Sequence, residues 1–313
     1  MLKKITSYTF LLVGLILLNS CKKEYESIQS IDDTKIKDYI SSNNITDAIE
    51  DPDKTGFYYQ IKTQGTGELF KTTDSVLYSV SVKSLLNGTN YHTTPAISNL
   101  GTYVGYASSF SYSGGSSVGS VGIQLPSLRK VLQTLKPGGV ARILLPSYLA
   151  FGKNGTTVLN IPSNENIEFT VTTYPEKSQR LLDDRRIREF IQSKGLTATK
   201  DPSTGVYYSV IQAGTGTEVI DLNTTLKAKY TGRTFDGTSF DSNTDGTFST
   251  TLLGVISGWE VLTKFTKGAK VRIFIPSSEG YGTTGSTDPT TGLVRIQPNA
   301  CLDFDIEIVD VTN

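Results

Sequence analysis

The sequence is poor in the residues that most metal sites and hydrolytic sites require. Its 313 residues include one histidine, His92, and two cysteines, Cys21 and Cys301. This set cannot form a usual zinc site, and a Ser-His-Asp triad would need His92 as its base although no serine motif accompanies it. The glycine-rich stretches lack a following Gly-Lys-Ser/Thr, so a phosphate-binding loop of that kind is excluded. We therefore expect no metal and no cofactor.

An excess of charge of one sign is also missing. The 30 Lys and Arg residues balance 30 Asp and Glu residues, so the formal net charge is zero. A dedicated nucleic-acid binder normally carries a basic face that neutralises phosphate, and we expect no nucleic-acid partner. Tyrosine (16), phenylalanine (13) and glycine (29) are plentiful instead. This composition favours strands and turns over long helices, and the chain length suggests two domains.

The N-terminus has the pattern of a secretion signal. Two lysines precede an apolar run over residues 10–18, which is too short for a comfortable membrane span. The next segment, Leu18-Asn19-Ser20-Cys21, resembles a bacterial lipobox, although Asn19 departs from the usual small apolar residue. This resemblance implies cleavage before Cys21 and acylation of its thiol. We expect a lipoprotein anchored at Cys21 to a bacterial membrane, the outer membrane facing the periplasm or the cell surface; the alternative is a plain signal peptide with an incidental cysteine.

One module occurs twice in the chain, at a spacing of about 150 residues. The matching segments are 32–40 with 183–191, 55–59 with 204–208, 65–67 with 214–216, 135–146 with 265–276, and 161–169 with 296–304. Such an ordered series indicates an internal repeat. The predicted divisions are a lipoprotein signal peptide over 1–20, a tether and short helix over 21–54, a first module over 55–177, a linker helix over 178–203, and a second module over 204–313.

Each module is expected to be α+β, a twisted antiparallel sheet wrapped on one short helix. The opening helices carry Asp32 and Asp183 near their starts, where acidic side chains complement the helix dipole. Strict alternation over residues 302–308 is typical of a strand with one buried and one wet face. The buried helix is predicted to start at Ser257, which with Glu260 has the form of a capping box. Cys301 is interpreted as a small buried hydrophobe, and no disulfide is predicted.

Five motifs of the second module are similar to those of the FKBP-type peptidyl-prolyl cis-trans isomerases in order and approximate spacing. They are Tyr230-Thr231-Gly232, residues 236–242, residues 254–259, Gly280-Tyr281-Gly282 and residues 296–300. The resemblance covers residues 205–311. Five ordered motifs are far more specific than any single short one. The resemblance implies two FKBP-like domains and an isomerase that needs no cofactor.

The resemblance also implies an apolar bowl for a substrate proline. Trp259 would form its floor, Asp241 would lie at the rim bonded to Tyr230, and the Ile256 N–H and Tyr281 hydroxyl would donate to peptide carbonyls. These five are the expected catalytic residues. The expected substrate-binding walls are Phe240, Phe248, Val255, Ile296 and Phe304. Each aromatic taken alone could be a core residue, Asp241 a turn residue and Tyr281 an exposed loop residue; their shared order favours the bowl.

Two other functions compete with an isomerase that acts on proline-containing, exported clients. The first is a non-catalytic proline-binding or chaperone module, because the loop over 282–295 is long enough to cover the bowl and Arg295 could select acidic clients. The second is a surface-interaction or glycan-binding lipoprotein, which rests on the anchor and a Ser/Thr-rich surface. Turnover of an X-Pro bond separates the isomerase from the non-catalytic module.

The first module is expected to have lost the site. The replacements are His92 for Asp241, Arg129 for Trp259, Ser81 for Tyr230, Phe151 for Tyr281 and Pro126 for Ile256. Proline removes the N–H that would bind a substrate carbonyl. A Ser/Gly-rich stretch over 108–122 is expected to add a flexible insertion. We predict a degenerate FKBP-like domain that still folds and serves dimerisation, client binding or spacing, with a homo-oligomer through this module left open.

Overall fold

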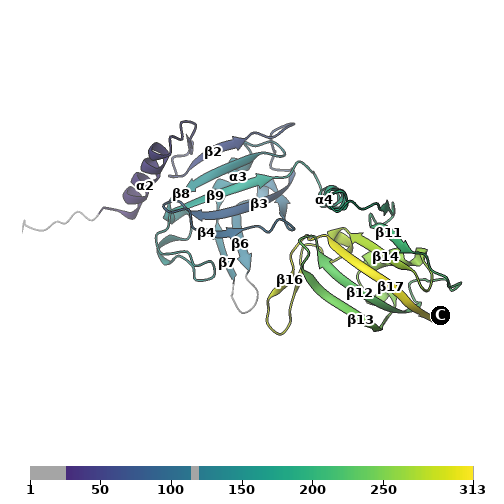
Figure 1. Ribbon diagram of the computed structural model, residues 1–313. Coiled ribbons are helices and arrows are strands. Elements are labelled where there is room, and N and C mark those ends of the chain that lie inside the picture. Colours follow the sequence, from purple (N-terminus) through teal and green to yellow (C-terminus); the bar gives the residue numbers. More distant parts are fainter. Residues whose placement is uncertain (1–25, 114–119, 313) are drawn as a thin grey trace, which may run out of the picture.

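The computed structural model describes residues 26–113 and 120–312, which form two units. Figure 1 shows each unit as an antiparallel sheet with a short helix packed in its curve, and helix α4 (Gln179–Ser193) runs between them. The predicted α+β class is confirmed. Cys21 and the signal segment lie outside the described residues. Among the described helices, none is long and apolar enough to cross a membrane.

The first unit contains a seven-stranded sheet with the order β1-β2-β8-β9-β3-β4, and β5 pairs with β3 off this path. The strands are β1 (Ile49–Glu50), β2 (Tyr58–Thr63), β3 (Ser75–Ser84), β4 (Asn90–Thr93), β5 (Leu100–Tyr103), β8 (Val140–Leu145) and β9 (Ile167–Thr173). A separate hairpin joins β6 (Ser109–Ser113) to β7 (Ser120–Gln124). The expectation of a flexible insertion over 108–122 was therefore wrong for the described part of this stretch, because its alternating residues pair as strands.

The second unit contains a six-stranded sheet with the order β10-β11-β14-β17-β12-β13. The strands are β10 (Thr199–Lys200), β11 (Tyr207–Gln212), β12 (Thr225–Thr234), β13 (Ser239–Thr250), β14 (Lys270–Ile275) and β17 (Leu302–Thr312). The long loop after Tyr281 forms a small hairpin of β15 (Ser286–Thr287) and β16 (Val294–Ile296). Strand for strand, the second sheet repeats the order of the first.

Strand pairing gives the correspondence between the units residue by residue. The strand β12 of the second unit corresponds to β3 of the first. Gly232 of β12 pairs with Asp241 and Phe304, and Val82 of β3 pairs with His92 and Phe169. Two residues earlier on these strands, Tyr230 corresponds to Val80. The sequence alignment of Tyr230 with Ser81 was wrong by one residue. Since successive strand residues face opposite sides of a sheet, that error exchanged a buried position for one on the other face.

The remaining described elements are short helices. The α-helices are α2 (Ile28–Ser42), α3 (Pro126–Leu132) and α4, and the 3₁₀ helices are η1 (Val104–Tyr106), η2 (Ser147–Leu149), η3 (Gly152–Asn154), η4 (Leu252–Gly254), η5 (Ser257–Lys264) and η6 (Ser277–Glu279). In the curve of its sheet the first unit has α3 and the second has η5.

The predicted capping box at the start of η5 was wrong. The N-cap residue is Ile256, and no side chain caps this end. The Ser257 hydroxyl donates instead to the Glu279 carboxylate, at 2.7 Å between Oγ and Oε2. A charged acceptor forms a stronger hydrogen bond than the neutral partner that a capping box offers. Trp259 and Leu262 are buried as their spacing predicted.

Helix α4 covers part of the outer face of the second sheet. Ile187 and Ile191 of this helix form an apolar cluster with Phe274 and Cys301. Cys301 is a free thiol that is 2% exposed, and burial raises its pKa. Its interpretation as a buried structural residue is confirmed.

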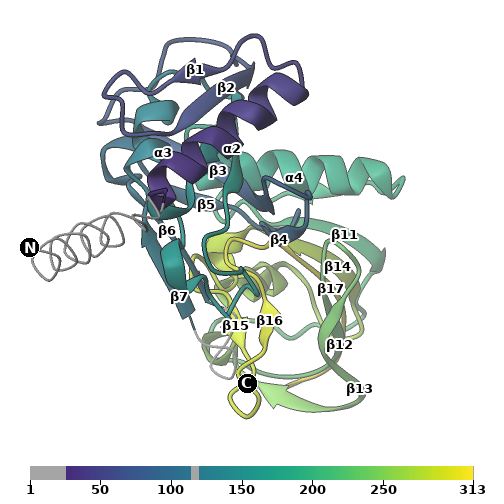
Figure 2. The same ribbon diagram turned by 90° about the vertical axis from the view of Figure 1, so that its left-hand side faces the viewer.

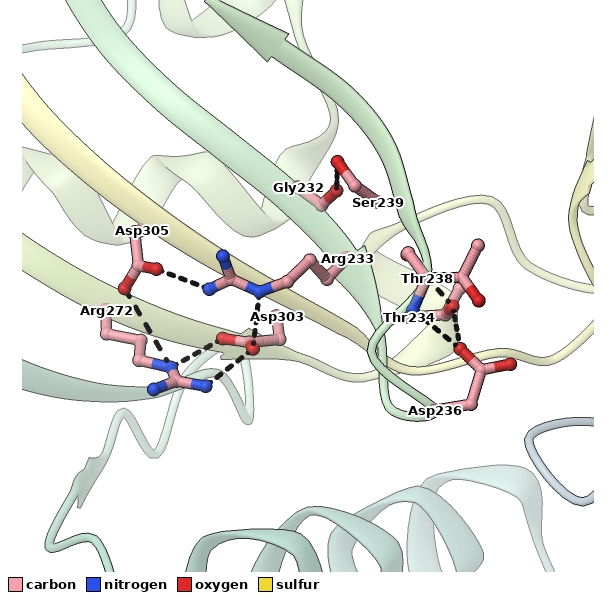
Figure 3. A network of polar contacts seen from close by, with 9 residues as sticks. All are labelled: Gly232, Arg233, Thr234, Asp236, Thr238, Ser239, Arg272, Asp303 and Asp305. Carbon is pink, nitrogen blue, oxygen red and sulfur yellow. Dashed lines mark hydrogen bonds and ion pairs between the residues drawn. The ribbon is translucent and has the colours of Figure 1, made fainter. Parts of the chain in front are cut away.

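The rest of that outer face carries a ladder of ion pairs, shown in Figure 3. Asp303 is 2% exposed and accepts from Arg272 at 2.8 Å (Nε) and 2.7 Å (Nη2). Arg233 donates to Asp303 at 3.3 Å and also pairs with Asp305. The expectation of a wet face along this strand was therefore wrong at Asp303, because two guanidinium groups cover its carboxylate.

A buried Asp-Ser pair connects each of the helices α2 and α4 to the unit that follows it. Asp183 of α4 is fully buried and accepts from the Ser277 N–H at 2.9 Å and the Ser277 hydroxyl at 2.6 Å. Asp32 of α2 holds Ser147 in the same way, at 2.9 and 2.6 Å. Neither aspartate lies in the first turn of its helix, so both act as buried acceptors and not as partners of the helix dipole. A buried carboxylate needs such donors because an unpaired interior charge is costly.

Replacing Asp183 with alanine is expected to loosen the second unit alone. The change leaves two donors of Ser277 unpaired and should lower the free energy of unfolding of that unit by about 3 kcal/mol. Urea unfolding followed by the fluorescence of Trp259 measures this, since it is the single tryptophan of the chain. Asp32→Ala is the matched control and should leave the Trp259 transition unchanged; equal transitions in both variants would contradict the assignment.

Candidate active site

The hairpin of β12 and β13 carries the first group of candidate residues. Its turn is closed by Asp236, which accepts from the Thr234 hydroxyl at 2.6 Å and the Thr238 N–H at 3.0 Å (Figure 3). These hydrogen bonds, the one from Thr234 foremost, hold the pKa of the Asp236 carboxyl below its usual range. Gly237 supplies the positive φ, 91°, that such a turn requires. A tight turn fixes the register that places Phe240 and Asp241 beside β12.

Gly232 on β12 makes room for two aromatic rings. A Cβ at this position would come within 2.6 Å of Phe304 and 2.8 Å of Phe240. Both rings therefore lie directly over the glycine backbone, and they meet edge to face at 5.5 Å. Sequence reasoning placed Gly232 in a motif without assigning it a role. The available signal was a glycine inside a strand, which often marks a close approach to the backbone.

The five rings of Tyr230, Phe240, Phe248, Trp259 and Phe304 form one aromatic cluster. Trp259 lies at its base, 2% exposed, with Tyr230 at 5.4 Å and Phe304 at 5.6 Å, both edge to face. Phe248 contacts Tyr230 at 5.0 Å. Such edge-to-face pairs are favourable beyond their buried area. Phe240 and Phe248 are only half-buried, so the cluster is closed below and open to solvent at its edge.

The three aliphatic candidates adjoin this cluster. Ile296 of β16 is 2% exposed and belongs to the same core. Val255 and Ile256 precede η5 and are half-buried against it. The structure thus brings together every substrate-binding residue expected from the sequence.

Tyr230 and Asp241 form the polar pair at the edge of the cluster. The Tyr230 hydroxyl donates to Asp241 Oδ2 at 2.8 Å, and the Ser242 N–H donates to Oδ1 at 2.9 Å. Burial, and then the bond to Asp241, raise the pKa of the Tyr230 phenol. The phenol therefore remains a proton donor at neutral pH, and the exposed carboxylate keeps a fixed orientation.

Two further donors at this place have no partner within the described residues. The Ile256 N–H has no intramolecular acceptor, although the Ile256 carbonyl accepts from the Trp259 N–H at 3.0 Å. The hydroxyl of Tyr281 makes no hydrogen bond, and its ring lies edge to face with Phe240 at 6.4 Å. Burial, and then the charge of Asp241, raise the pKa of Tyr281. Tyr281 is 37% exposed, so its hydroxyl is accessible to a ligand.

Residues 216–309 match the family model described as FKBP-type peptidyl-prolyl cis-trans isomerase. The second unit belongs to this family. The chain is 38% identical over 126 residues to FkpA of Escherichia coli K12, a match that covers 39% of this chain and 43% of that protein. It is 31% identical over 157 residues to FkpA of Buchnera aphidicola from Schizaphis graminum, with 49% and 57% covered. The chain thus spans about half the length of these curated relatives.

A solved structure also resembles part of the chain. The peptidyl-prolyl cis-trans isomerase of Pseudomonas syringae pv. tomato is 29% identical, covering 44% of this chain and 99% of that one, with a TM-score of 0.36.

The first unit repeats the FKBP-type sheet, but an inserted ring occupies part of the place of the aromatic cluster, beside a cavity of about 200 Å³. Phe110, from the β6–β7 hairpin, is 4% exposed and meets Phe169 edge to face at 5.6 Å. Phe169 is the counterpart of Phe304, and Trp259 contacts Phe304 at the same 5.6 Å. Arg129, which the sequence aligned with Trp259, is exposed instead and donates to the Gly105 carbonyl at 3.4 Å.

Other changes close the first unit further. Val82 is fully buried at the position of Gly232, so a side chain occupies the space that two rings share in the second unit. Val80 occupies the position that Tyr230 has in the second unit, and it has no hydroxyl that could donate to a carboxylate. Pro126 begins α3, where it offers no N–H. Sequence reasoning missed Phe110, because the alternation of Ser109-Phe110-Ser111-Tyr112 indicates a strand but not which distant residues its rings contact.

Replacing Phe110 with alanine is expected to destabilise the first FKBP-like unit by about 3–5 kcal/mol, the usual cost of deleting a buried ring. The expected loss appears in urea unfolding followed by circular dichroism, while the Trp259 transition of the second unit stays in place. Tyr106→Ala is the control, since that ring is 78% exposed in the same unit. An unchanged first transition in Phe110→Ala would show that this ring does not fill the unit.

Proposed function

We propose that the second unit catalyses cis–trans isomerisation of X-Pro bonds. The observation that carries this proposal is the aromatic cluster with two unengaged donors, Ile256 N–H and Tyr281 hydroxyl, at its edge. The family match of residues 216–309 supports the same activity.

The reaction requires a site of this kind. Rotating an X-Pro amide breaks its resonance, with a barrier on the order of 20 kcal/mol. The planar amide is dipolar, whereas the twisted amide is less dipolar and has its lone pair on nitrogen. An apolar surface such as the aromatic cluster therefore disfavours the planar ground state relative to the twisted state, which is differential binding of the transition state. Each gain of about 1.4 kcal/mol raises the rate tenfold.

Each side chain has a role in this proposal. The proline ring lies on Trp259 between the half-exposed edges of Phe240 and Phe248. The Ile256 N–H and the Tyr281 hydroxyl donate to carbonyls of the substrate and hold its chain while the preceding carbonyl turns. Asp241 fixes the Tyr230 ring in the wall. No bond to the protein is made or broken, so the chemistry needs no nucleophile.

The structure also bears on the non-catalytic alternative. Selection of acidic clients by Arg295 is not supported, because its guanidinium pairs with Asp288. The N–H groups of Thr291 and Thr290 lower the pKa of Asp288 to about 2, so this partner stays charged. The hairpin of β15 and β16 folds on itself through that pair and leaves Tyr281 accessible.

Replacing Asp241 with valine is expected to lower kcat/KM for an X-Pro peptide about tenfold, a loss of about 1.4 kcal/mol. The change frees the Tyr230 hydroxyl and lets its ring move, while Asp241 is exposed, so the thermal transition should stay broadly unchanged. Trp259→Ala is a poorer test, since removing a buried indole costs about 3–5 kcal/mol in stability. A protease-coupled isomerisation assay on the full-length protein makes the measurement.

The matched control is Asp245→Val, because Asp245 is an exposed aspartate on the same strand β13. It should keep full activity. Full activity in Asp241→Val would overturn the site assignment. A folded wild-type protein without any acceleration would favour the alternative, a proline-binding or chaperone module.

We further propose that the protein is a lipoprotein that assists the folding of exported, proline-containing clients at a bacterial outer membrane. The sequence that supports this is the charged start, the apolar run over 10–18 and the lipobox-like ending at Cys21.

Replacing Cys21 with serine is expected to abolish incorporation of radiolabelled palmitate and release the protein from the membrane fraction of the producing bacterium. Cys301→Ser is the control, since this is the only other cysteine and it is buried in the second unit. Labelling that persists in Cys21→Ser, or is lost in Cys301→Ser, would refute the anchor.

A further inference from the structure

A cavity of about 360 Å³ lies between the two units. One wall comes from the first unit and contains the segment from β4 to β5 and the strand β6. The other wall comes from the β15–β16 hairpin and the residues that follow it. Figures 1 and 2 both show the β6–β7 hairpin beside the β15–β16 hairpin, so this arrangement does not depend on the view.

A polar clamp at the inner end of the cavity fixes the two walls. The Ser98 hydroxyl donates to the Pro298 carbonyl at 2.7 Å, and the Asn299 amide donates to the Asn99 carbonyl at 2.9 Å. Ser98 is 5% exposed and Asn99 is 1% exposed. Buried polar groups of this kind are costly unless their partners remain in place, so the clamp favours one relative placement of the units.

Arg186 of α4 completes the clamp. Its guanidinium donates to the Ser98 carbonyl at 2.8 Å and to the Asn99 side chain at 2.8 Å, and it lies over the Tyr174 ring at 5.3 Å. Gln179 of the same helix exchanges two hydrogen bonds with Asn99, at 2.8 and 3.1 Å. The linker helix therefore joins the units through direct contacts and not only through the chain.

The cavity adjoins the proposed active site along the chain. Ile296 belongs to the core below the aromatic cluster, and the next two residues, Gln297 and Pro298, line the cavity. Val294, on the same strand as Ile296, lines it as well. The strand β16 and the two residues after it therefore join the core of the proposed active site to the cavity.

The wall that the first unit contributes includes residues at the position of the second unit's site. His92 occupies the position of Asp241, but its ring lies against Tyr112 at 4.8 Å and Phe110 at 5.7 Å. Burial lowers the pKa of His92, which keeps the imidazole neutral at pH 7. The ring that closes the first bowl, Phe110, also contributes to this wall.

The chemistry of the lining is aromatic and polar without formal charge. Among the described residues that line the cavity there is no Asp, Glu, Lys or Arg. Rings, threonine hydroxyls and the Gln297 amide suit a peptide chain, whose backbone offers both donors and acceptors. They do not suit a strongly charged segment, which would lose its hydration without gaining a partner.

We propose that this cavity is a second binding site for the substrate polypeptide, and that it takes uncharged residues flanking the X-Pro bond held at the aromatic cluster. The inference rests on the proposed isomerase function. It gives the first unit a role: the segment from β4 to β5 and the strand β6 form one wall of the client site.

The test compares two substrates on the full-length protein. One is a short peptide with a single X-Pro bond, and the other adds about six uncharged residues on each side, which extend about 20 Å. The wild-type protein should prefer the longer peptide about tenfold in kcat/KM. Tyr112→Ser and Thr287→Glu alter opposite walls, and each should remove most of this preference while leaving the short peptide unaffected.

Tyr103→Ser is the matched control, because Tyr103 is 54% exposed in the same unit and does not line the cavity. It should keep the preference. Equal kcat/KM for both peptides in the wild type, or equal losses on both peptides in the variants, would overturn the proposal. Thr287 is exposed, so Thr287→Glu stays informative even where Tyr112→Ser disturbs folding.

A separate measurement distinguishes failure of the proposed function from failure of this site. Where the wild type accelerates neither peptide, the isomerase proposal fails, and binding of the fluorescently labelled longer peptide decides on the cavity. Tighter binding to the wild type than to Thr287→Glu supports the cavity as a polypeptide site. Equal binding overturns it.

Discussion

The missing side chain at Gly232 is the constraint on which the candidate site depends. This residue lies on β12, which is paired on both sides, where a Cβ would come within 2.6 Å of Phe304 and 2.8 Å of Phe240. Because the space is empty, the rings of Phe240 and Phe304 pack over the backbone, and Phe304 meets Trp259 edge to face. In the first unit a buried valine, Val82, occupies the same place. The two units therefore differ at this position in whether two rings can approach the strand backbone.

The fold class and the repeat could be predicted because both rest on local or ordered signals. Alternation along a strand and the order of five motifs can be recognised in the sequence without knowledge of tertiary contacts. The expectations that were wrong share one cause: each residue concerned contacts a partner far away in the sequence. Ser257 binds Glu279 rather than closing its own helix, and Asp303 is buried by two arginines from other strands. Phe110 fills a bowl built by other strands, and no local pattern around it indicates that destination. The candidate site residues could be grouped from the sequence because their order resembles that of a known family, whose fold already brings such residues together.

In the proposed function, the second unit binds the proline and the first unit contributes a wall for the flanking residues. The second unit has an aromatic cluster with two unengaged donors at its edge, and the first unit has the same sheet with Phe110 in part of the corresponding space. The buried aspartates of the two helices α2 and α4 hold each unit in the same way, so both copies of the repeat share this framework. The polar clamp around Arg186 then presents the rim of the first unit to the loop that follows Ile296. In this proposal, His92 and Phe110, which alter the first site, also line the shared cavity.

The most direct test of the central claim is the rate of cis–trans exchange of an X-Pro peptide, measured by NMR exchange spectroscopy with catalytic amounts of protein. The account predicts that the wild type accelerates exchange, that Gly232→Val abolishes the acceleration, and that Val82→Gly in the first unit leaves it unchanged. Full acceleration by a folded Gly232→Val protein would contradict it, because the aromatic cluster could not then be where the proline binds.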